Sequence, residues 1–518
     1  MLGAFHKFLL KMCDPNSSTV IEDHTIVDAI RKLSINPAPS IRESNHKNVF
    51  QLPVELMAEV FATICHADSD KFLGDKSRHK KTTPLTLASV CGQWRDIVWC
   101  TPHIWSHVSL CLDDKRYETQ VELLTEWLGR SGACPLTINL VFVDENLWTE
   151  RIPTELIEIL ASNAPRWRSI NFVLPEAWYP LLEKTRENYH LLTTVSTQPL
   201  WADCGLSPSK RKRLELFAFA PSLHDLHLNG YYLSDVTLPW HQLTRFTLQH
   251  VYLDECFDAL PKTPNLTWCR IYTILVNDVD RLVVERPVEL LHLEKLIIYS
   301  ATWSDTVTLL SNMSFPCLRS FEISSPQTGP LLEELPELLI LANGRNITRL
   351  SLTEYRNDKE DQCYIDLLRK MPLLEEVELD FLPDSKQMNT QFIVDLLQAY
   401  PLPQTLPSGD QIVSEDFILP LLQRFTFVGP VKTTDRLDSD EVADNHGADF
   451  PKELLRVLGQ RRRRSEGGKL LGIFEMKVEN DLSELRPSEF TSEVMQGLQS
   501  LVTEGLSLSI NVGGTSWL

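Results

Sequence analysis

The stretch VCGQWRDIVWCTPHIW (90–105) combines cysteines and a histidine that could bind a metal or carry out thiol chemistry. Cys91, Cys100 and the later Cys111 are 9 and 11 residues apart. Structural zinc sites normally use closely spaced cysteine pairs, and this region has none. Cys91 falls on an apolar stripe with Trp94, which favours a buried, inert thiol. We therefore expect no metal site here and interpret the tryptophans as packing residues.

Other residue types that support catalysis do not form a recognisable site. In HDLH (224–227) the histidines alternate with leucines on a predicted strand. His224 and His227 would then point to opposite faces and make a poor pair of metal ligands. The chain has no Gly-x-Ser-x-Gly motif, and its Gly-Lys in RRRRSEGGKLL lacks the other residues of a phosphate-binding loop. The sequence predicts a protein without catalytic residues, bound metal or cofactor.

The composition is that of a large, acidic globular protein. The chain has 518 residues, a formal net charge of -20, and 43% hydrophobic and 23% charged residues. General nucleic-acid binding needs a basic face that displaces counterions from phosphates, so the acidic balance argues against it. No apolar run approaches the ~20 residues that span a bilayer, so no membrane partner is expected. The 11 cysteines lack close pairing, which is typical of reduced thiols in the cytoplasm or nucleus.

Three short helices are predicted around the opening stretch. In QLPVELMAEVFATICHAD (51–68), Pro53 suits a helix start and apolar residues repeat at helical spacing. LTLASVCGQWRDIVW (85–99) has the same periodicity, and Gly92 marks a break between two helices. The polar segment between them is interpreted as a loop. A helical unit of about 50 residues buries little surface alone, so we expect it to pack on a partner or on the next domain.

A motif of three apolar positions, separated by two residues and then by one, recurs from about 135 to 510. Between 223 and 374 its first positions are 20 to 29 residues apart. Its last two apolar positions alternate as in a strand with one buried face, and helical segments fill the intervals. The instances are Trp167-Ile170-Phe172, Leu223-Leu226-Leu228, Leu243-Phe246-Leu248, Leu266-Cys269-Ile271, Leu293-Leu296-Ile298, Leu318-Phe321-Ile323, Ile347-Leu350-Leu352, Leu374-Val377-Leu379, Leu422-Phe425-Phe427 and Leu471-Phe474-Met476.

One strand and one helix per 20 to 29 residues is the period of a leucine-rich repeat. The repeats are divergent, because Tyr231 and Val251 stand where Asn or Cys usually closes the turn. We therefore predict an α/β fold in which a short all-helical module precedes an irregular, horseshoe-like leucine-rich-repeat solenoid. The expected parts are an N-terminal extension that could form one helix (1–47), the helical module (48–110) and the repeat domain (111–518), with insertions near 384–420 and 430–450.

Two basic clusters, SKRKR (209–213) and RRRR (461–464), have more than one interpretation. Either could be a nuclear-import signal or an anchor for an acidic partner. A solvated loop or helix face is the simpler interpretation of both.

Residues 48–105 resemble the F-box motif, although 68–83 form a longer polar insertion than the compact version has. The following blocks TPHIWSHVSL, EWLGRSGACPLTINL and NAPRWRSINF resemble the continuation in fungal F-box-like proteins. Inside the motif, the resemblance rests on Leu52-Pro53, Leu56, Val60, Val90-Cys91, Trp94 and Ile97.

The resemblance implies a substrate-recognition subunit of a cullin-RING (Skp-cullin-F-box) ubiquitin ligase, in which other subunits carry out catalysis. The helices would dock a Skp-type adaptor that connects to the cullin and RING subunits, and the repeats would hold an unknown protein substrate. The alternative is a leucine-rich-repeat scaffold that acts outside a ligase. Trp94 would pack the helices together, and the adaptor-binding residues would be Leu52, Pro53, Leu56, Val60, Leu87, Val90 and Ile97. The substrate-binding candidates, which alternate with buried strand positions, are His227, Thr247, Arg270, Ser351 and Glu378.

Overall fold

The fold is taken from a computed structural model of the chain. The expected N-terminal extension, the cluster at 209–212 and most of the expected insertion at 430–450 lie outside the residues that it describes. Those residues are 52–66, 83–112, 117–142, 154–175, 178–199, 213–275, 287–299, 303–325, 335, 337–339, 346–354, 361–382, 388–405, 411–432, 450–463, 470–478, 490–512 and 515–516.

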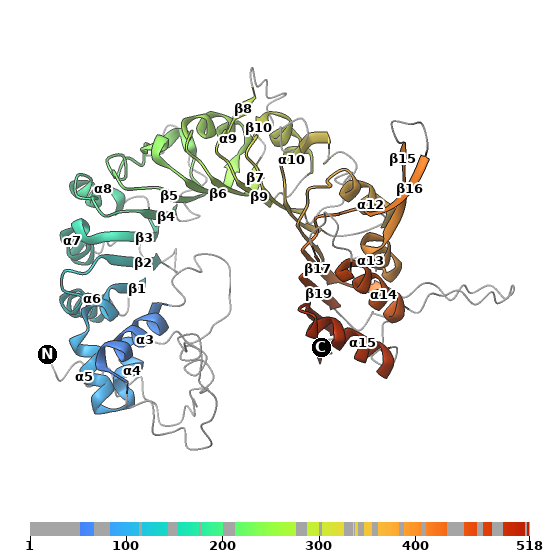
Figure 1. Ribbon diagram of the computed structural model, residues 1–518. Coiled ribbons are helices and arrows are strands. Elements are labelled where there is room, and N and C mark those ends of the chain that lie inside the picture. The colour runs from blue at the N-terminus through green and yellow to red at the C-terminus, as the bar shows by residue number, and fades with distance from the viewer. Residues whose placement is uncertain are drawn as a thin grey trace. The chain divides into compact units, whose positions relative to one another are not determined.

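The chain divides into two compact units, Met1–Asn171 and Phe172–Leu518. The first unit begins with short helices and continues with strands that alternate with helices (Figure 1). Its elements are α3 (Val54–His66), α4 (Pro84–Val90), α5 (Gly92–Cys100), a 3-10 turn (Pro102–Trp105), β1 (His107–Leu112), α6 (Tyr117–Arg130), β2 (Leu136–Phe142), α7 (Thr154–Ser162) and β3 (Trp167–Leu174), which crosses the boundary between the units.

The second unit repeats the strand–helix alternation and adds the antiparallel pairs β15–β16 and β20–β21. Its strands are β4 (Thr194–Pro199), β5 (Asp225–Asn229), β6 (Arg245–Tyr252), β7 (Trp268–Leu275), β8 (Val288–Glu289), β9 (Lys295–Tyr299), β10 (Met313–Ser314), β11 (Ser320–Ser325), β12 (Arg349–Glu354), β13 (Glu376–Phe381), β14 (Met388–Asn389), β15 (Ala399–Thr405), β16 (Gln411–Phe417), β17 (Arg424–Gly429), β18 (Val431–Lys432), β19 (Ile473–Val478), β20 (Ser507–Val512) and β21 (Thr515–Ser516). Its helices are α8 (Tyr179–Leu182), α9 (Leu253–Ala259), α10 (Trp303–Ser311), α12 (Asp361–Arg369), α13 (Thr390–Leu397), α14 (Phe450–Arg463) and α15 (Ser492–Thr503).

The predicted fold class is wrong. One sheet of 15 strands joins the strands in the order β1-β2-β3-β4-β5-β6-β7-β9-β11-β12-β13-β17-β19-β20-β21. Its first 14 strands form a parallel sheet, and β21 pairs antiparallel with β20. The architecture is an α/β fold built on one large, open sheet. It replaces the predicted combination of a separate all-helical module and an irregular leucine-rich-repeat solenoid.

The ten apolar triads explain why a sequence with irregular intervals forms one regular sheet. Every residue of these triads is exposed by 2% or less, and the last two residues of each lie in a strand. Equivalent positions pair across the sheet, with Leu226 opposite Phe246 and Phe246 opposite Cys269. The different lengths of the connections therefore leave the strand register unchanged.

The strand order of the second unit also determines where the connections pack. Its strands follow one another in chain order, and parallel crossovers are right-handed in almost all proteins. Successive crossovers therefore pack on the same face, and Figure 1 shows α9, α10, α12 and α13 on the same side of their strands. In the part of this unit that the structure describes, the opposite face carries the residues that alternate with the buried triads.

The break predicted at Gly92 is confirmed, since α4 ends at Val90 and α5 begins at Gly92. Cys91 caps the N-terminus of α5, where its sulfur accepts a hydrogen bond from the Trp94 amide at 3.5 Å. The prediction of a buried Cys91 thiol is wrong, because this capping position leaves the side chain half-buried. Helix caps lie at the edge of a helix bundle and use side-chain acceptors for free amides.

The tryptophans of the opening stretch are packing residues, as predicted. Trp94 is 8% exposed, and its ring contacts Phe61 of α3. Trp105 is 1% exposed; its indole N–H donates to the Val98 carbonyl at 2.8 Å, and its ring centroid lies 4.9 Å from that of Trp127 on α6. Helices α3–α5 therefore share one core with the first strand–helix pair of their unit.

The segment predicted as an insertion at 384–420 contains a buried helix, α13, and the antiparallel β15–β16 hairpin. Arg461 of the basic cluster secures this region. Its guanidinium donates to the carbonyls of Leu396, Leu397 and Leu419 at 3.2, 2.9 and 2.5 Å, and it lies 3.9 Å from the Phe417 ring centroid. With 3% exposure, Arg461 is neither solvated nor available to a partner.

Candidate functional site

The seven predicted adaptor-binding residues do not form one surface. Pro53 is exposed, Leu52 is half-buried, and Leu56 and Val90 are 53% and 48% exposed. The other three, Val60, Leu87 and Ile97, are 5% exposed or less and belong to the core that joins α3, α4 and α5. The helical period identified the apolar positions, but it did not separate those that face the core from those that face solvent.

Sequence reasoning missed one exposed residue of this helical module, Val54. Helix α3 buries Met57, Val60 and Phe61, whereas Val54 at its first turn is 53% exposed. Nine large apolar side chains are exposed among the residues that the structure describes, and three of them, Val54, Leu56 and Val90, lie on α3 and α4. We call these three residues the exposed apolar set. The position of Val54 beside the helix-starting proline was the available signal.

Three histidines come together where α3 ends and β1 begins. The rings of His66 and His107 stack with centroids 3.5 Å apart, and His103 approaches His66 at 5.1 Å. Burial and, to a smaller extent, the charge of His103 lower the pKa of His66 to about 4, against the raising effect of a hydrogen bond with the Ile104 backbone. Burial is also the largest cause that lowers the pKa of His107 to about 3, together with the charges of His66, His103 and Arg168. Both rings are therefore neutral near pH 7.

The five predicted substrate-binding residues lie in one row across the second unit's sheet. The strand register places His227 opposite Thr247 and Thr247 opposite Arg270. It continues through Ile297 and Glu322 to Ser351 and Glu378. We call this series, His227, Thr247, Arg270, Ile297, Glu322, Ser351 and Glu378, the central row. It lies on the face opposite the buried triads.

A stack of rings and guanidinium groups covers part of this face. The Arg245 guanidinium carbon lies 4.5 Å from the Trp268 ring centroid, and that of Arg270 lies 4.9 Å from it and 5.5 Å from the Tyr272 centroid. The Tyr272 and Tyr299 rings are 4.5 Å apart with planes 12° from parallel. We call these five residues, from three neighbouring strands, the cation–aromatic stack. Sequence reasoning identified only Arg270 among them, and the contacts that join Arg245 to Trp268 and Tyr272 to Tyr299 depend on strand register.

Ion pairs follow one another along the polar face of the second unit's sheet. Arg245 pairs with Asp225 at 3.4 Å, and Lys295 pairs with Glu322 at 3.6 Å. On the strands after β11, the acidic groups are bonded to a cation and to a hydroxyl. Arg349 pairs with Glu376 at 2.6 Å, and the Ser351 hydroxyl donates to Glu378 at 3.3 Å.

Burial lowers the pKa of His227 to about 4; a hydrogen bond with Gln249 opposes this shift, and the charge of Arg270 adds to it. His227 is therefore neutral near pH 7.

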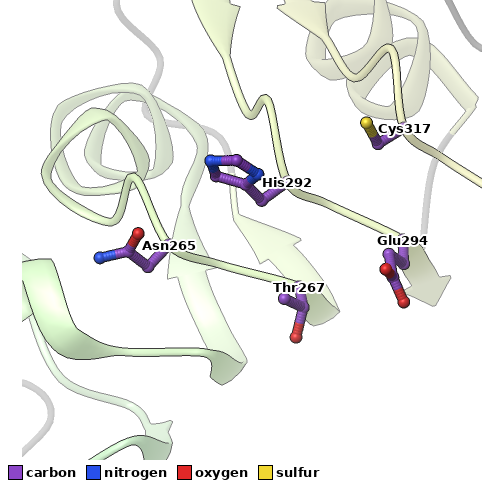
Figure 2. A pocket seen from close by; sticks show the side chains of 5 residues that line it. All are labelled: Asn265, Thr267, His292, Glu294 and Cys317. Carbon is purple, nitrogen blue, oxygen red and sulfur yellow. The ribbon is translucent and has the colours of Figure 1, made fainter.

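A shallow pocket of about 310 Å³ lies where β7, β9 and β11 begin. Asn265, Thr267, His292, Glu294 and Cys317 line it. Figure 2 shows these side chains spread along successive strand entries without converging on one point. Asn265 is engaged with the His241 carbonyl at 2.7 Å, and Thr267 with the Thr244 carbonyl at 3.0 Å. This arrangement does not assemble a nucleophile with a base, so the pocket is not a candidate catalytic centre.

Among the residues that the structure describes, no group of three His, Cys, Asp or Glu side chains could hold a metal ion. None of the helices in these residues is long and apolar enough to cross a membrane. No family model and no curated protein match the chain.

Proposed function

We propose that this chain is the substrate-recognition subunit of a cullin-RING ubiquitin ligase in the cytoplasm or nucleus. Helices α3–α5 dock a Skp-type adaptor, which connects the chain to the cullin and RING subunits. The polar face of the second unit's sheet holds a protein substrate. The chain contributes proximity, because fixing the substrate near the conjugating enzyme makes the transfer effectively intramolecular.

The observation that carries this proposal is the exposed apolar set on the helical module that resembles an F-box. The core of the module is complete without Val54, Leu56 and Val90, since Met57, Phe61, Trp94 and Val98 fill it. Large apolar side chains that stay exposed beside a complete core are available for burial against a partner protein. An amphipathic helix that buries one stripe and exposes other apolar residues fits docking against a partner's groove.

The polar sheet face supports the second half of the proposal. The central row and the cation–aromatic stack place charged, hydroxyl and aromatic side chains on neighbouring parallel strands. A rigid sheet holds such groups at fixed spacing, so a partner can be recognised without reorganisation of the surface.

The test is adaptor binding by the full chain in which Leu56→Asp and Val90→Asp are combined. Each buried apolar anchor typically contributes about 2 kcal/mol, so affinity for a fungal Skp-type adaptor should fall by more than about 30-fold. The matched control combines Leu291→Asp and Leu373→Asp, which replace residues that are 52% and 44% exposed in the second unit. Isothermal titration calorimetry should show unchanged adaptor affinity for the control.

Adaptor capture also distinguishes the ligase proposal from the alternative, a scaffold protein that acts outside a ligase. A scaffold would bind its partner through the sheet face and would recover neither adaptor nor cullin. Wild-type chain that fails to bind the adaptor at micromolar concentrations would therefore exclude the ligase proposal. Unchanged adaptor binding by the Leu56→Asp and Val90→Asp chain would exclude the exposed apolar set as its contact surface.

A further inference from the structure

In the cation–aromatic stack, rings and guanidinium groups contact one another's faces. Tyr272 and Tyr299 stack face to face, and the guanidinium groups of Arg245 and Arg270 lie over the Trp268 ring. The ring faces are therefore occupied by neighbours within the stack. Aromatic rings carry their positive electrostatic potential at the edge, and guanidinium groups present only N–H donors. The Tyr299 hydroxyl already donates to Glu322 at 2.6 Å and Arg245 is paired with Asp225, so the Arg270 guanidinium carries the unpaired positive charge of the stack.

Arg270 is the cation of this surface that has no internal counterion. Arg245 has Asp225 and Lys295 has Glu322 as ion-pair partners. Across the described parts of the chain, no carboxylate lies within ion-pair distance of Arg270; its guanidinium contacts the Trp268 and Tyr272 rings instead. Its Nε is buried and makes no hydrogen bond among these residues. Half-buried arginines are normally paired, so this one has unused capacity for an anion.

The residues beside Arg270 in the central row do not offset its charge. Thr247 is 8% exposed, and Ile297 is fully buried although it lies on the polar face. The burial of Ile297 indicates that long side chains lie over β9, which reduces solvent screening near Arg270. His227, two strands away, adds no charge near pH 7. A cation in such a partly desolvated position attracts an anion more strongly than a fully solvated cation does.

We propose that Arg270 is the centre of an anion-recognition site that holds an acidic polypeptide segment of a partner. A carboxylate of that segment accepts N–H groups of Arg270, and the segment crosses β6, β7 and β9. Neighbouring strands are about 4.8 Å apart, so about three extended residues cross these strands. Arg270 supplies the charge complementary to such a segment, since Arg245 and Lys295 are already paired with Asp225 and Glu322.

This inference deepens the proposed function by naming the chemistry of the bound segment, and it rests on that function only for calling the segment a substrate. Peptide binding is therefore measured on the full chain without adaptor. A failure of peptide binding leaves adaptor docking untouched, and a failure of adaptor docking leaves peptide binding untouched. The two results are read out in separate titrations.

The experiment uses a fluorescein-labelled peptide of about eight residues, in which Glu alternates with Ser, so that it exceeds the crossing length. A peptide with Gln at every Glu position is the control ligand. Fluorescence anisotropy should show millimolar or tighter binding of the acidic peptide and at least about tenfold weaker binding of the Gln peptide. Affinity should also fall as salt rises, because the contact joins opposite charges that stay partly solvated.

Arg270→Gln should weaken binding of the acidic peptide by at least about tenfold. Arg349→Gln is the matched control, since Arg349 lies on the same face but is already paired with Glu376. It should leave binding within about twofold. If Arg270→Gln fails to fold, Arg270→Lys decides, because it keeps the charge but loses the planar fork and should bind the acidic peptide more weakly than wild type.

Four outcomes overturn the proposal. They are no binding of the acidic peptide by wild-type protein at millimolar concentration, equal binding of the Glu and Gln peptides, equal loss in Arg349→Gln and Arg270→Gln, and tighter binding of an oligothymidine than of the acidic peptide. The last result would indicate nucleic acid as the occupant of this face.

Discussion

The ring centroids of Phe61 on α3 and Trp94 on α5 lie 4.7 Å apart, and the ring planes meet at 53°. Both rings are buried, at 1% and 8% exposure. The pair therefore joins the first and last helices of the module across a single contact. The Trp94 indole Nε1 is buried and makes no hydrogen bond among the residues that the structure describes. The ring contributes through packing alone.

This geometry predicts different effects for two substitutions of Trp94. Trp94→Ala removes the ring and leaves a cavity, which typically costs about 3–5 kcal/mol in the free energy of unfolding. Trp94→Phe keeps an aromatic contact with Phe61 and removes a buried donor without a partner, so it should cost less than about half as much. Hydrogen exchange of the amides in α3 and α5 measures both. Equal loss of protection in the two variants would contradict a packing role.

Arg461 of α14 hydrogen-bonds to α13 and to the segment after β16, so its substitution should lower the stability of that region. Arg461→Met keeps much of the side-chain volume but leaves the carbonyls of Leu396, Leu397 and Leu419 without their donor. Unsatisfied buried polar groups cost about 1–3 kcal/mol each, so thermal unfolding should begin several degrees lower. Arg463→Met is the control, because that residue of the same helix is exposed. A similar drop for both variants would indicate a general charge effect.

Individual strands were predictable because burial leaves a local pattern. Leu243, Phe246 and Leu248 occupy the predicted positions relative to β6, and all three are buried. The joining of the strands into one sheet was not predictable in the same way. Register is a property of two strands, and a single sequence shows only one strand at a time. The irregular intervals therefore suggested an irregular solenoid, while the paired positions form one parallel sheet.

The candidate site was predictable to a similar extent. Alternation with buried positions correctly placed Arg270 and Ser351 on the polar face. The contacts of Arg270 with Trp268 and Tyr272 follow from positions on one strand, but the stacking of Tyr272 on Tyr299 requires the register of two strands. On the helical module, Val60 and Leu87 were assigned to the surface because a helical stripe has no intrinsic inside or outside.

The histidine cluster predicts acid sensitivity of the first unit. The pKa of His66 is lowered to about 4 and that of His107 to about 3, both below the ordinary value of 6.5. The unfolded chain therefore binds more protons than the folded chain below pH 6.5, and protonation favours unfolding. Stability is complete above about pH 6.5 and falls as the pH decreases toward 4. The charges of His103 and Arg168 do not offset this loss, because each acts to lower the pKa of His107.

Hydrogen exchange of α3 and β1 at pH 7.5 and pH 5.5, corrected for intrinsic exchange, checks this prediction. Protection should be lower at pH 5.5 in wild-type protein. His107→Gln cannot titrate, so its protection should change less between the two pH values. Amides of β17 and β19 serve as the internal control, since the described residues of these strands include no histidine. An equal change in both regions would point to a general effect of acid on the carboxylates.

Gly429 at the end of β17 is the most restrictive glycine position in the sheet. Its φ of 147° is one that other residues rarely adopt, and an added Cβ would lie 2.8 Å from the Cβ of Phe381 on β13. Gly429→Ala should therefore lower the free energy of unfolding by about 1–3 kcal/mol through strain and displacement of a fully buried ring. Gly472→Ala is the matched control, because its Cβ would meet its nearest neighbour, the Gln423 carbonyl oxygen, at an ordinary 3.7 Å. Urea unfolding monitored by circular dichroism should show a lower midpoint only for Gly429→Ala. A midpoint equal to that of wild type would mean that β13 and β17 separate without cost at this position.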